Sequence, residues 1–114
     1  MTTDGIQAVY LMTHNWGKTA QFFQSLGFDL EFDTGHSSGQ FRKGKGPYIF
    51  VAEVPADREP AMQVVVAATE AEAAEFDPVV DVVTPFEDTH FGTREMTVRD
   101  PDGRLWTLQA PAKS

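Results

Sequence analysis

The stretch NWGKTAQFFQSLGF, residues 15–28, decides how the first half of the chain folds. Asn15 is a favoured N-cap residue, and apolar side chains then recur at the helical period. The residues that share this face are Trp16, Ala20, Phe23 and Leu26. Gly27 accepts the positive φ that commonly ends a helix. The stretch therefore predicts a helix that ends at Gly27 and passes directly into a strand.

Short runs of β-forming residues, bounded by turn residues, lie on both sides of this helix. In the first half we expect strands at 6–12, 28–32, 40–42 and 48–53. A polar connector with two prolines follows at 55–60. The pattern then restarts with a strand at 62–67, a short helix at 69–75, strands at 81–84 and 94–99, a DPDG turn at 100–103 and a last strand at 104–109. Because strand, helix and three strands occur twice, we predict one α+β domain over 1–114, with two β-α-β-β-β modules at about 5–54 and 61–110.

The bulk composition narrows the class of protein. The chain has 114 residues and is 41% hydrophobic, which suits one domain with a packed core. It has no cysteine, so disulfides and thiolate zinc sites are excluded. It contains no apolar run of bilayer-spanning length, and its first residues lack the layout of a signal peptide. We expect a soluble cytoplasmic protein that does not bind membranes.

The charge balance is acidic. Nine basic residues stand against seventeen acidic ones, giving a formal net charge of −8. Nucleic-acid binding needs clustered Lys and Arg, so we expect no nucleic-acid partner. The excess acid can serve solubility alone, or it can create a field that favours cationic small molecules. The sequence leaves both interpretations open.

Two stretches carry a resemblance to a known family. They are WGKTAQFFQSLGF at 16–28 and FGTREMTVRDPDG at 91–103. Their order and separation around the Pro-rich connector resemble the vicinal oxygen chelate superfamily of glyoxalases, bleomycin resistance proteins and dioxygenases. The resemblance implies that the two modules form a curved, incomplete barrel around a cleft, and that the protein is a homodimer. Many members hold a divalent metal in the cleft through His, Glu or Gln.

The family's metal ligands would fall at four strand positions in this chain: Ala8, Gln63, Thr107, and Glu53 or one of its neighbours. Ala8 has no donor atom, and Thr107 is a poor neutral ligand for a hard divalent cation. His14, His36 and His90 fall outside these positions. We therefore expect no metal ligands and no other cofactor. A divalent metal held at a shifted site by Glu53 with Gln63 is a disfavoured alternative.

Strand alternation suggests which residues line the cleft instead. One face of the first, fifth and last strands is large and apolar, while the other mixes small residues with Tyr, Gln and Thr. The ligand-binding candidates are Tyr10, Trp16, Phe50, Gln63, His90, Thr107 and Gln109. Several have a structural alternative. Tyr10 suits a core edge, Gln63 and Thr107 suit a half-buried sheet, and His90 suits a hairpin loop. Trp16, like Trp106, suits packing under a helix.

The sequence supports three classes of function. The first is metal-independent binding or sequestration of a small aromatic or cationic molecule, similar to bleomycin resistance proteins and antibiotic resistance. The second is an enzyme of the same superfamily, a lyase, isomerase or dioxygenase acting on a small metabolite. It would use a shifted metal, or Tyr10, His14 or His90. The third is an accessory domain whose own side chains fill the cleft. No catalytic residue is assigned, because no nucleophile or acid–base pair is evident.

Overall fold

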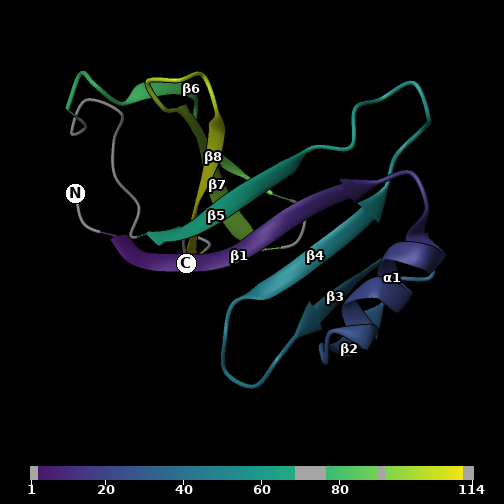
Figure 1. The fold of residues 1–114 in the computed structure, drawn as a ribbon. Helices are drawn as coiled ribbons and strands as arrows, with labels where there is room; N and C mark the ends of the chain where they lie inside the picture. The colour runs from purple at the N-terminus through teal and green to yellow at the C-terminus, as the bar shows by residue number, and fades with distance from the viewer. Residues whose placement is uncertain (1–2, 69–76, 90–91, 112–114) are drawn as a thin grey trace. The chain divides into compact units, whose positions relative to one another are not determined.

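The computed structural model describes residues 3–68, 77–89 and 92–111, and it divides into two compact units (Figure 1). The N-terminal unit is Ala8–Gln63. The C-terminal unit is formed by Met1–Gln7 together with Val64–Ser114. Each unit has its own strands and its own hydrophobic core, so each is described separately.

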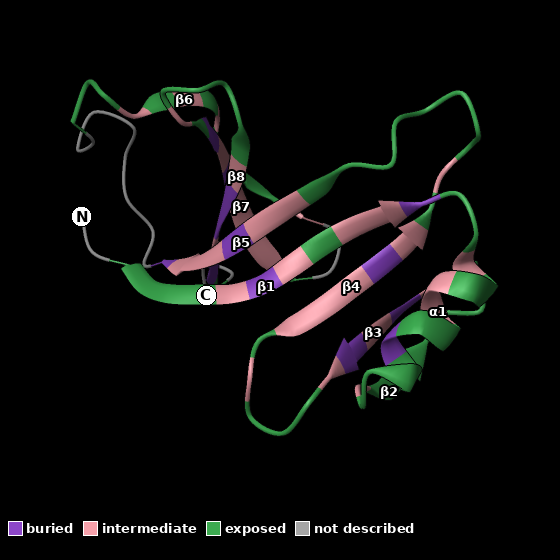
Figure 2. Ribbon diagram, viewed as in Figure 1, coloured by how far each residue is buried: buried purple, intermediate pink, exposed green. Residues whose placement is uncertain are grey.

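The N-terminal unit is a mixed sheet with one helix packed on it. Its elements are β1 (Thr3–Thr13), α1 (Trp16–Ser25), β2 (Asp29–Asp33), β3 (Ser38–Arg42) and β4 (Tyr48–Glu53). The part of β1 before Ala8 belongs to the C-terminal unit. The strand order is β2-β3-β4-β1, with β1 parallel to β4 and the other neighbours antiparallel. The core lies between α1 and the sheet, where Phe23, Phe41 and Val51 are buried (Figure 2). The predicted first four strands and the helix are therefore confirmed.

Helix α1 begins as the sequence predicts. The Oδ1 of Asn15 accepts a hydrogen bond from the Lys18 backbone N–H at 3.0 Å, which satisfies one of the free donors of the first turn. Gly27 has φ 96°, the left-handed conformation that ends the helix. The prediction that Leu26 shares the buried face is wrong. Leu26 is the C-cap and is 61% exposed, because the helix has already ended at Ser25.

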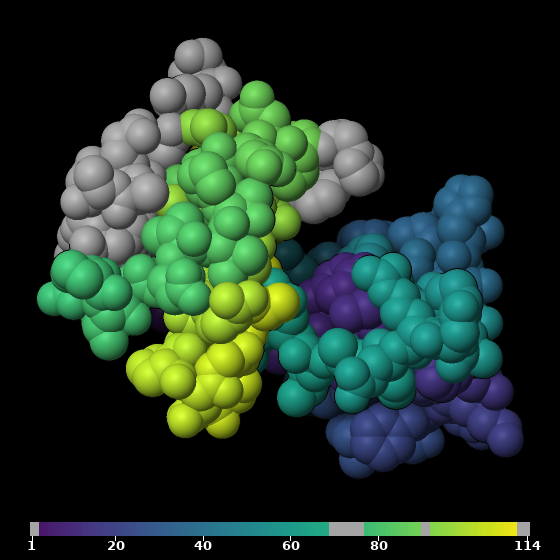
Figure 3. Space-filling model, turned by 90° about the horizontal axis from the view of Figure 1, so that it is seen from above, coloured from purple at the N-terminus to yellow at the C-terminus, as the bar shows by residue number. Residues whose placement is uncertain are grey.

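The connector after β4 packs back on the turn between β1 and α1 (Figure 3). The Val54 backbone N–H donates to the carbonyl of Thr13 at 2.8 Å, and the Met12 N–H donates to the carbonyl of Ala61 at 2.8 Å. The Nε2 of His14 lies 2.6 Å from the Arg58 carbonyl oxygen. These contacts tie the connector to the N-terminal unit, and they give His14 a structural partner.

Close packing between α1 and β3 requires a glycine on the strand. The Trp16 ring lies 5.8 Å from the Phe41 ring, which is completely buried. A Cβ built on Gly39 would stand 2.7 Å from the Trp16 ring and 2.7 Å from the Phe32 carbonyl oxygen. The absence of a side chain at Gly39 is therefore what lets the indole reach the sheet.

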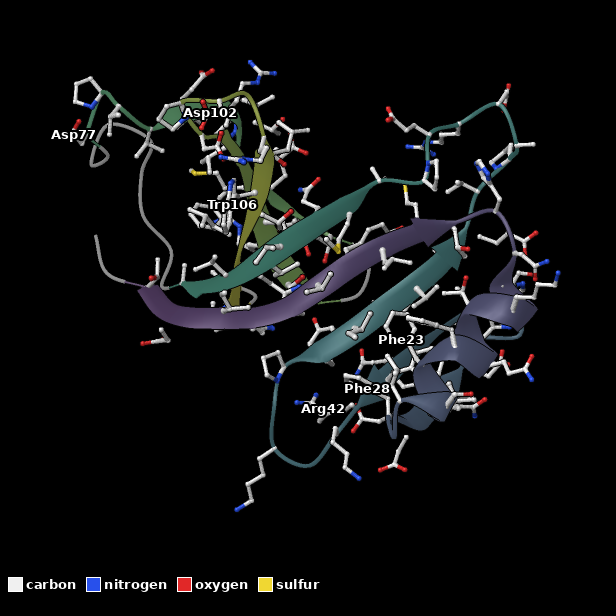
Figure 4. The ribbon with its side chains drawn as sticks, viewed as in Figure 1. Phe23, Phe28, Arg42, Asp77, Asp102 and Trp106 are labelled. Carbon is white, nitrogen blue, oxygen red and sulfur yellow. The ribbon has the colours of Figure 1, made fainter. Side chains whose placement is uncertain are left out.

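In its described residues the C-terminal unit contains four further strands. They are β5 (Met62–Ala68), β6 (Asp81–Asp88), β7 (Thr93–Arg99) and β8 (Leu105–Pro111), in the order β5-β8-β7-β6. Strand β5 is parallel to β8, and the other neighbours are antiparallel. The first two residues of β5 belong to the N-terminal unit. Its core contains Ala68, Met96, Val98 and Leu108, with Trp106 packed against them (Figure 4). The predicted helix at 69–75 lies outside the described residues.

Strand β6 runs further than the sequence predicts. The expected strand covers 81–84, and the next residue, Pro85, has no backbone N–H and normally interrupts a ladder. In the structure β6 continues through Pro85 to Asp88. It can do so because β6 ends the strand order, and an edge strand needs ladder bonds on one side only. The pairing with β7 carries register irregularities around this proline.

The predicted turn at 100–103 is confirmed and is organised by one carboxylate. The Oδ1 of Asp100 accepts from the backbone N–H groups of Asp102 at 2.9 Å and Arg104 at 3.0 Å. Its Oδ2 accepts from the Trp106 indole N–H at 3.0 Å and the Arg104 Nε at 2.9 Å. The indole bond, then the bonds from Arg104, lower the pKa of the Asp100 carboxyl below its usual range. The charged carboxylate therefore holds the turn and orients Trp106.

Within the described ranges, no helix is long and apolar enough to cross a membrane; α1 has ten residues.

We predict that Gly39→Ala destabilises the protein by about 1–3 kcal/mol, because the added methyl collides with both the Trp16 ring and a backbone carbonyl. Gly17→Ala is the matched control. Gly17 lies in the first turn of α1, and its added Cβ would come no closer than 3.8 Å to the Asn15 side chain. This control should leave the free energy of unfolding unchanged or raise it by up to about 1 kcal/mol. Urea unfolding followed by Trp fluorescence measures both, and equal stabilities of the two variants would contradict the packing argument.

We predict that Asp100 contributes to acid sensitivity. A carboxyl with a pKa lowered by folding stabilises the native state above its unfolded pKa, near 3.9, and loses that contribution as the pH falls. Asp100→Asn should therefore lower the melting temperature at pH 7 and flatten its fall between about pH 4 and 2. Asp102→Asn, which changes an exposed carboxylate in the same turn, should keep the wild-type acid slope. Thermal unfolding across this pH range checks the prediction, and parallel wild-type and Asp100→Asn curves would refute it.

Candidate functional site

The sheet face of the N-terminal unit that lies away from α1 carries a row of aromatic side chains. Tyr10 on β1 pairs with Phe50 on β4, Phe50 pairs with Gln40 on β3, and Gln40 pairs with Phe32 on β2. The Tyr10 and Phe50 rings stack with centroids 5.9 Å apart and planes at 13°. The Phe32 and Phe50 rings are 6.4 Å apart. We call Tyr10, Phe50 and Phe32 the aromatic row.

Strand alternation explains why these rings face away from the helix. Leu11, Phe41 and Val51 pack under α1, so their chain neighbours Tyr10 and Phe50 point to the opposite side. Within this chain the row is only partly covered, since Tyr10 is 37% exposed and Phe32 is 47% exposed. Large apolar side chains gathered on an open face are typical of an interaction site.

Three polar side chains, Glu31, Gln40 and Arg42, border the aromatic row on β2 and β3. The Glu31 carboxylate accepts from the Gln40 Nε2 at 3.0 Å and from the Arg42 Nε at 3.1 and 3.2 Å. The Arg42 guanidinium lies over the Tyr48 ring, 5.3 Å from its centroid. Hydrogen bonds from Gln40 and then Arg42 lower the pKa of the Glu31 carboxyl. The row is therefore bordered by a carboxylate and a guanidinium that balance each other in charge.

An irregularity in β2 places Glu31 beside the row. The pairing register of β2 with β3 shifts between Leu30 and Phe32. Because of this bulge, Glu31 and Phe32 both reach partners on the face that carries Gln40, although they are adjacent in sequence. Simple alternation assigns two neighbouring residues to opposite faces, so sequence analysis missed both. Gln40, Arg42 and Tyr48 were likewise missed.

The structure brings Tyr10 and Phe50 together, but it separates Trp16 from them. Trp16 packs beneath α1 against Phe41 and Gly39, on the other side of the sheet, which is the helix-packing alternative. Gln63 is half-buried on β5 at the end of the unit. None of these observations tests ligand binding, so each residue's role as a ligand contact stays a prediction.

In the C-terminal unit, Gln109 joins a hydrogen-bonded chain of polar side chains. The Gln7 Nε2 donates to the Gln109 Oε1, and the Gln109 Nε2 donates to the Glu95 Oε2 at 2.9 Å. Thr107, two residues before Gln109, is 8% exposed and pairs with Thr97 on β7. His90 lies outside the described residues. Sequence analysis missed Glu95 and Gln7, because the pairing of β7 with β8 is what aligns Glu95 with Gln109.

The strand positions at which the resemblance implies a metal offer a poor donor set. Ala8 presents a methyl group and is 1% exposed. The Glu53 Oε2 accepts a hydrogen bond from the Trp16 backbone N–H at 3.2 Å, at the start of α1. Among the described residues, no group of three or more His, Cys, Asp or Glu is placed to hold a metal ion. These donors do not fit a hard divalent cation, and a metal-free site stays a prediction.

Comparison with known proteins identifies the fold. The sequence matches no family model and no curated protein. A glyoxalase/bleomycin resistance protein/dioxygenase superfamily member from Vibrio splendidus 12B01 matches the structure with TM-score 0.66 and 13% identity, over 96% of this chain and 99% of that one. BphC, a halotolerant catechol dioxygenase, matches with TM-score 0.64 and 16% identity, over 98% of this chain and 41% of its own. Streptomyces coelicolor methylmalonyl-CoA epimerase, in complex with 2-nitronate-propionyl-CoA, matches with TM-score 0.62 and 15% identity, over 98% and 100%.

These likenesses place the chain in a class by its fold. It is an α+β protein with the glyoxalase/bleomycin resistance fold, as the resemblance of its two sequence stretches predicts. The predicted barrel and cleft between the modules stay a prediction. At such identities the fold is shared and the chemistry is not implied, since one fold hosts many functions. The function must therefore be argued from this chain's own residues.

Proposed function

We propose that the protein binds a flat aromatic small molecule at the aromatic row, without using a metal. The observation that carries this proposal is the stacked, partly exposed pair of Tyr10 and Phe50, extended by Phe32. These rings come from three strands of one sheet, so the backbone fixes their spacing. A preorganised aromatic surface loses little side-chain entropy when a ligand settles on it.

Affinity at the row would come mainly from burying apolar surface. Each ring covered by a ligand removes apolar area from water, worth roughly 25 cal/mol per Å². A favourable aromatic contact adds about 0.5–1.5 kcal/mol beyond the area term. The Tyr10 hydroxyl offers a hydrogen-bonding group at the row, which suits a ligand with a polar substituent.

The polar border supports a preference for charged aromatic ligands. Glu31 can meet a cationic substituent, and Arg42 can meet an anionic one. The net charge of −8 raises the local concentration of cations around the whole chain, which favours the cationic class. We therefore infer that the physiological ligand is a planar aromatic cation, and that the protein sequesters it rather than transforms it.

The same proposal includes the wider expectations from the sequence. A homodimer in the cytoplasm would fit sequestration of a toxic or antibiotic compound, as in bleomycin resistance proteins. The enzyme alternative, a lyase, isomerase or dioxygenase, needs a metal or an acid–base pair. The row presents neither, because its polar neighbours are a paired carboxylate and guanidinium. Elemental analysis of protein purified without chelators separates the two functions, since stoichiometric iron, manganese, nickel or zinc would favour the enzyme.

We predict that proflavine, a planar aromatic cation, binds with higher affinity than acridine, which is uncharged at pH 7.5, or acridine-9-carboxylate. Tyr10→Leu and Phe50→Leu should each weaken proflavine binding by about three- to ten-fold, through loss of ring contact. Fluorescence titration gives the Kd, and urea midpoints confirm that each variant is folded.

Phe22→Leu is the matched control. Phe22 is a 57% exposed phenylalanine on α1, outside the row. It should leave the Kd for proflavine unchanged. Absence of binding for all three acridines, or an equal effect of Phe22→Leu and Phe50→Leu, would refute the assignment of the row.

A further inference from the structure

A second candidate site lies within the C-terminal unit, at the ends of its strands. It is a pocket of about 310 Å³, in the size range of small-molecule sites. Its walls come from the first residues of β1 and β7 and the last residues of β5 and β8. The lining residues are Asp4, Gln7, Ala67, Ala68, Thr93, Gln109, Ala110 and Pro111.

Small residues create the space in this pocket. Ala68 is 5% exposed and Ala110 is 1% exposed, so both are packed into the fold. With Ala67 and Pro111 they form the apolar part of the lining. A larger side chain at the more accessible Ala67, which lies beside Gln109 on the neighbouring parallel strand, would occupy part of the volume.

The polar part of the lining has a fixed orientation. A carboxylate only accepts hydrogen bonds, so Glu95 forces Gln109 to present its Nε2 to that side and its Oε1 to Gln7. The Gln7 side chain must then donate through its Nε2. Its Oε1 is left as the acceptor at the end of this row of three hydrogen-bonded side chains. The hydrogen bonds from Gln109 to Glu95 and from Gln7 to Gln109 therefore fix Gln7 in the orientation that presents its Oε1.

The charged groups beside the pocket are mainly acidic, because Arg94, the cross-strand partner of Ala110, is ion-paired with Asp88 at 3.1 Å. Asp4 contributes a carboxylate to the lining, and the eight lining residues include no Lys, Arg or His. Glu95 stands behind Gln109, and Glu87 is the cross-strand partner of Glu95 on β6. A ligand entering here meets carboxylate and amide oxygens beside small apolar side chains. That environment suits a hydrogen-bond donor with a positive charge.

We propose that this pocket binds a small aliphatic molecule carrying a primary ammonium group. The ammonium donates to the Asp4 carboxylate and the Gln7 Oε1, and the hydrocarbon part covers Ala67 and Pro111. This site is separate from the aromatic row, which lies in the other unit, and it takes a different ligand class. The aromatic row can fail its test without affecting this proposal.

The test uses the full-length, ¹⁵N-labelled protein, whose Gln7 and Gln109 side-chain amides report directly on the pocket. Three probes share one ring and differ in the polar group: cyclohexylamine, which is an ammonium ion at pH 7, cyclohexanol and cyclohexanecarboxylate. None is aromatic, so none can stack on the aromatic row as a flat ring does, and binding is read at the Gln7 and Gln109 amides outside that row. Cyclohexylamine should shift both glutamine amide signals in a saturable manner, and the other two probes should not.

Two variants and one control test whether cyclohexylamine binds in this pocket. Asp4→Asn should weaken cyclohexylamine binding by about five- to ten-fold, through loss of one charge-assisted hydrogen bond. Ala67→Leu should abolish binding by occupying part of the pocket volume. Asp29→Asn, an exposed carboxylate on β2, should leave the Kd unchanged. The proposal is overturned if cyclohexylamine leaves both glutamine signals in place, if all three probes bind equally, or if neither variant changes the Kd.

Discussion

Burial of one sheet face beneath α1 is the constraint on which the rest of the N-terminal unit depends. Phe41 and Val51 are completely buried beneath α1. Because side chains alternate between the two faces of a strand, their chain neighbours point to the opposite face. A shift of β4 by one residue would put Phe50 into the core and expose Val51. The aromatic row is thus a by-product of burying the opposite face. Its spacing is set by the ladder between strands and needs no contact of its own to hold it.

Much of this architecture follows from short-range signals in the sequence. Asn15 and Gly27 bracket the helix, and the bounds of β4 agree with the predicted 48–53, because caps and β-formers act locally. Three features escaped prediction because they depend on a neighbouring strand. The bulge that turns Glu31 toward the aromatic row exists only relative to β3. The alignment of Glu95 with Gln109 requires the β7–β8 register. The passage of β6 through Pro85 requires an edge position.

The fold and the site carry different information about function. The glyoxalase/bleomycin resistance fold is shared with proteins of unlike chemistry, among them a catechol dioxygenase and an epimerase. At strand positions where the resemblance implies metal ligands, Ala8 presents a methyl group and Glu53 accepts a hydrogen bond from the Trp16 backbone N–H. Aromatic and amide side chains occupy the accessible positions, which favours recognition of organic molecules by shape, stacking and hydrogen bonds.

The acid on β2 has a consequence for self-association. Asp29, Glu31 and Asp33 alternate along a strand that ends the strand order, so another copy's β2 would meet like charges along its whole length. At the other end of the order, Pro85 removes an N–H from β6. Both outer strands are therefore poor templates for the addition of a further strand. A continuous backbone ladder between two copies is disfavoured at both ends of the order, and contact through side chains is favoured instead.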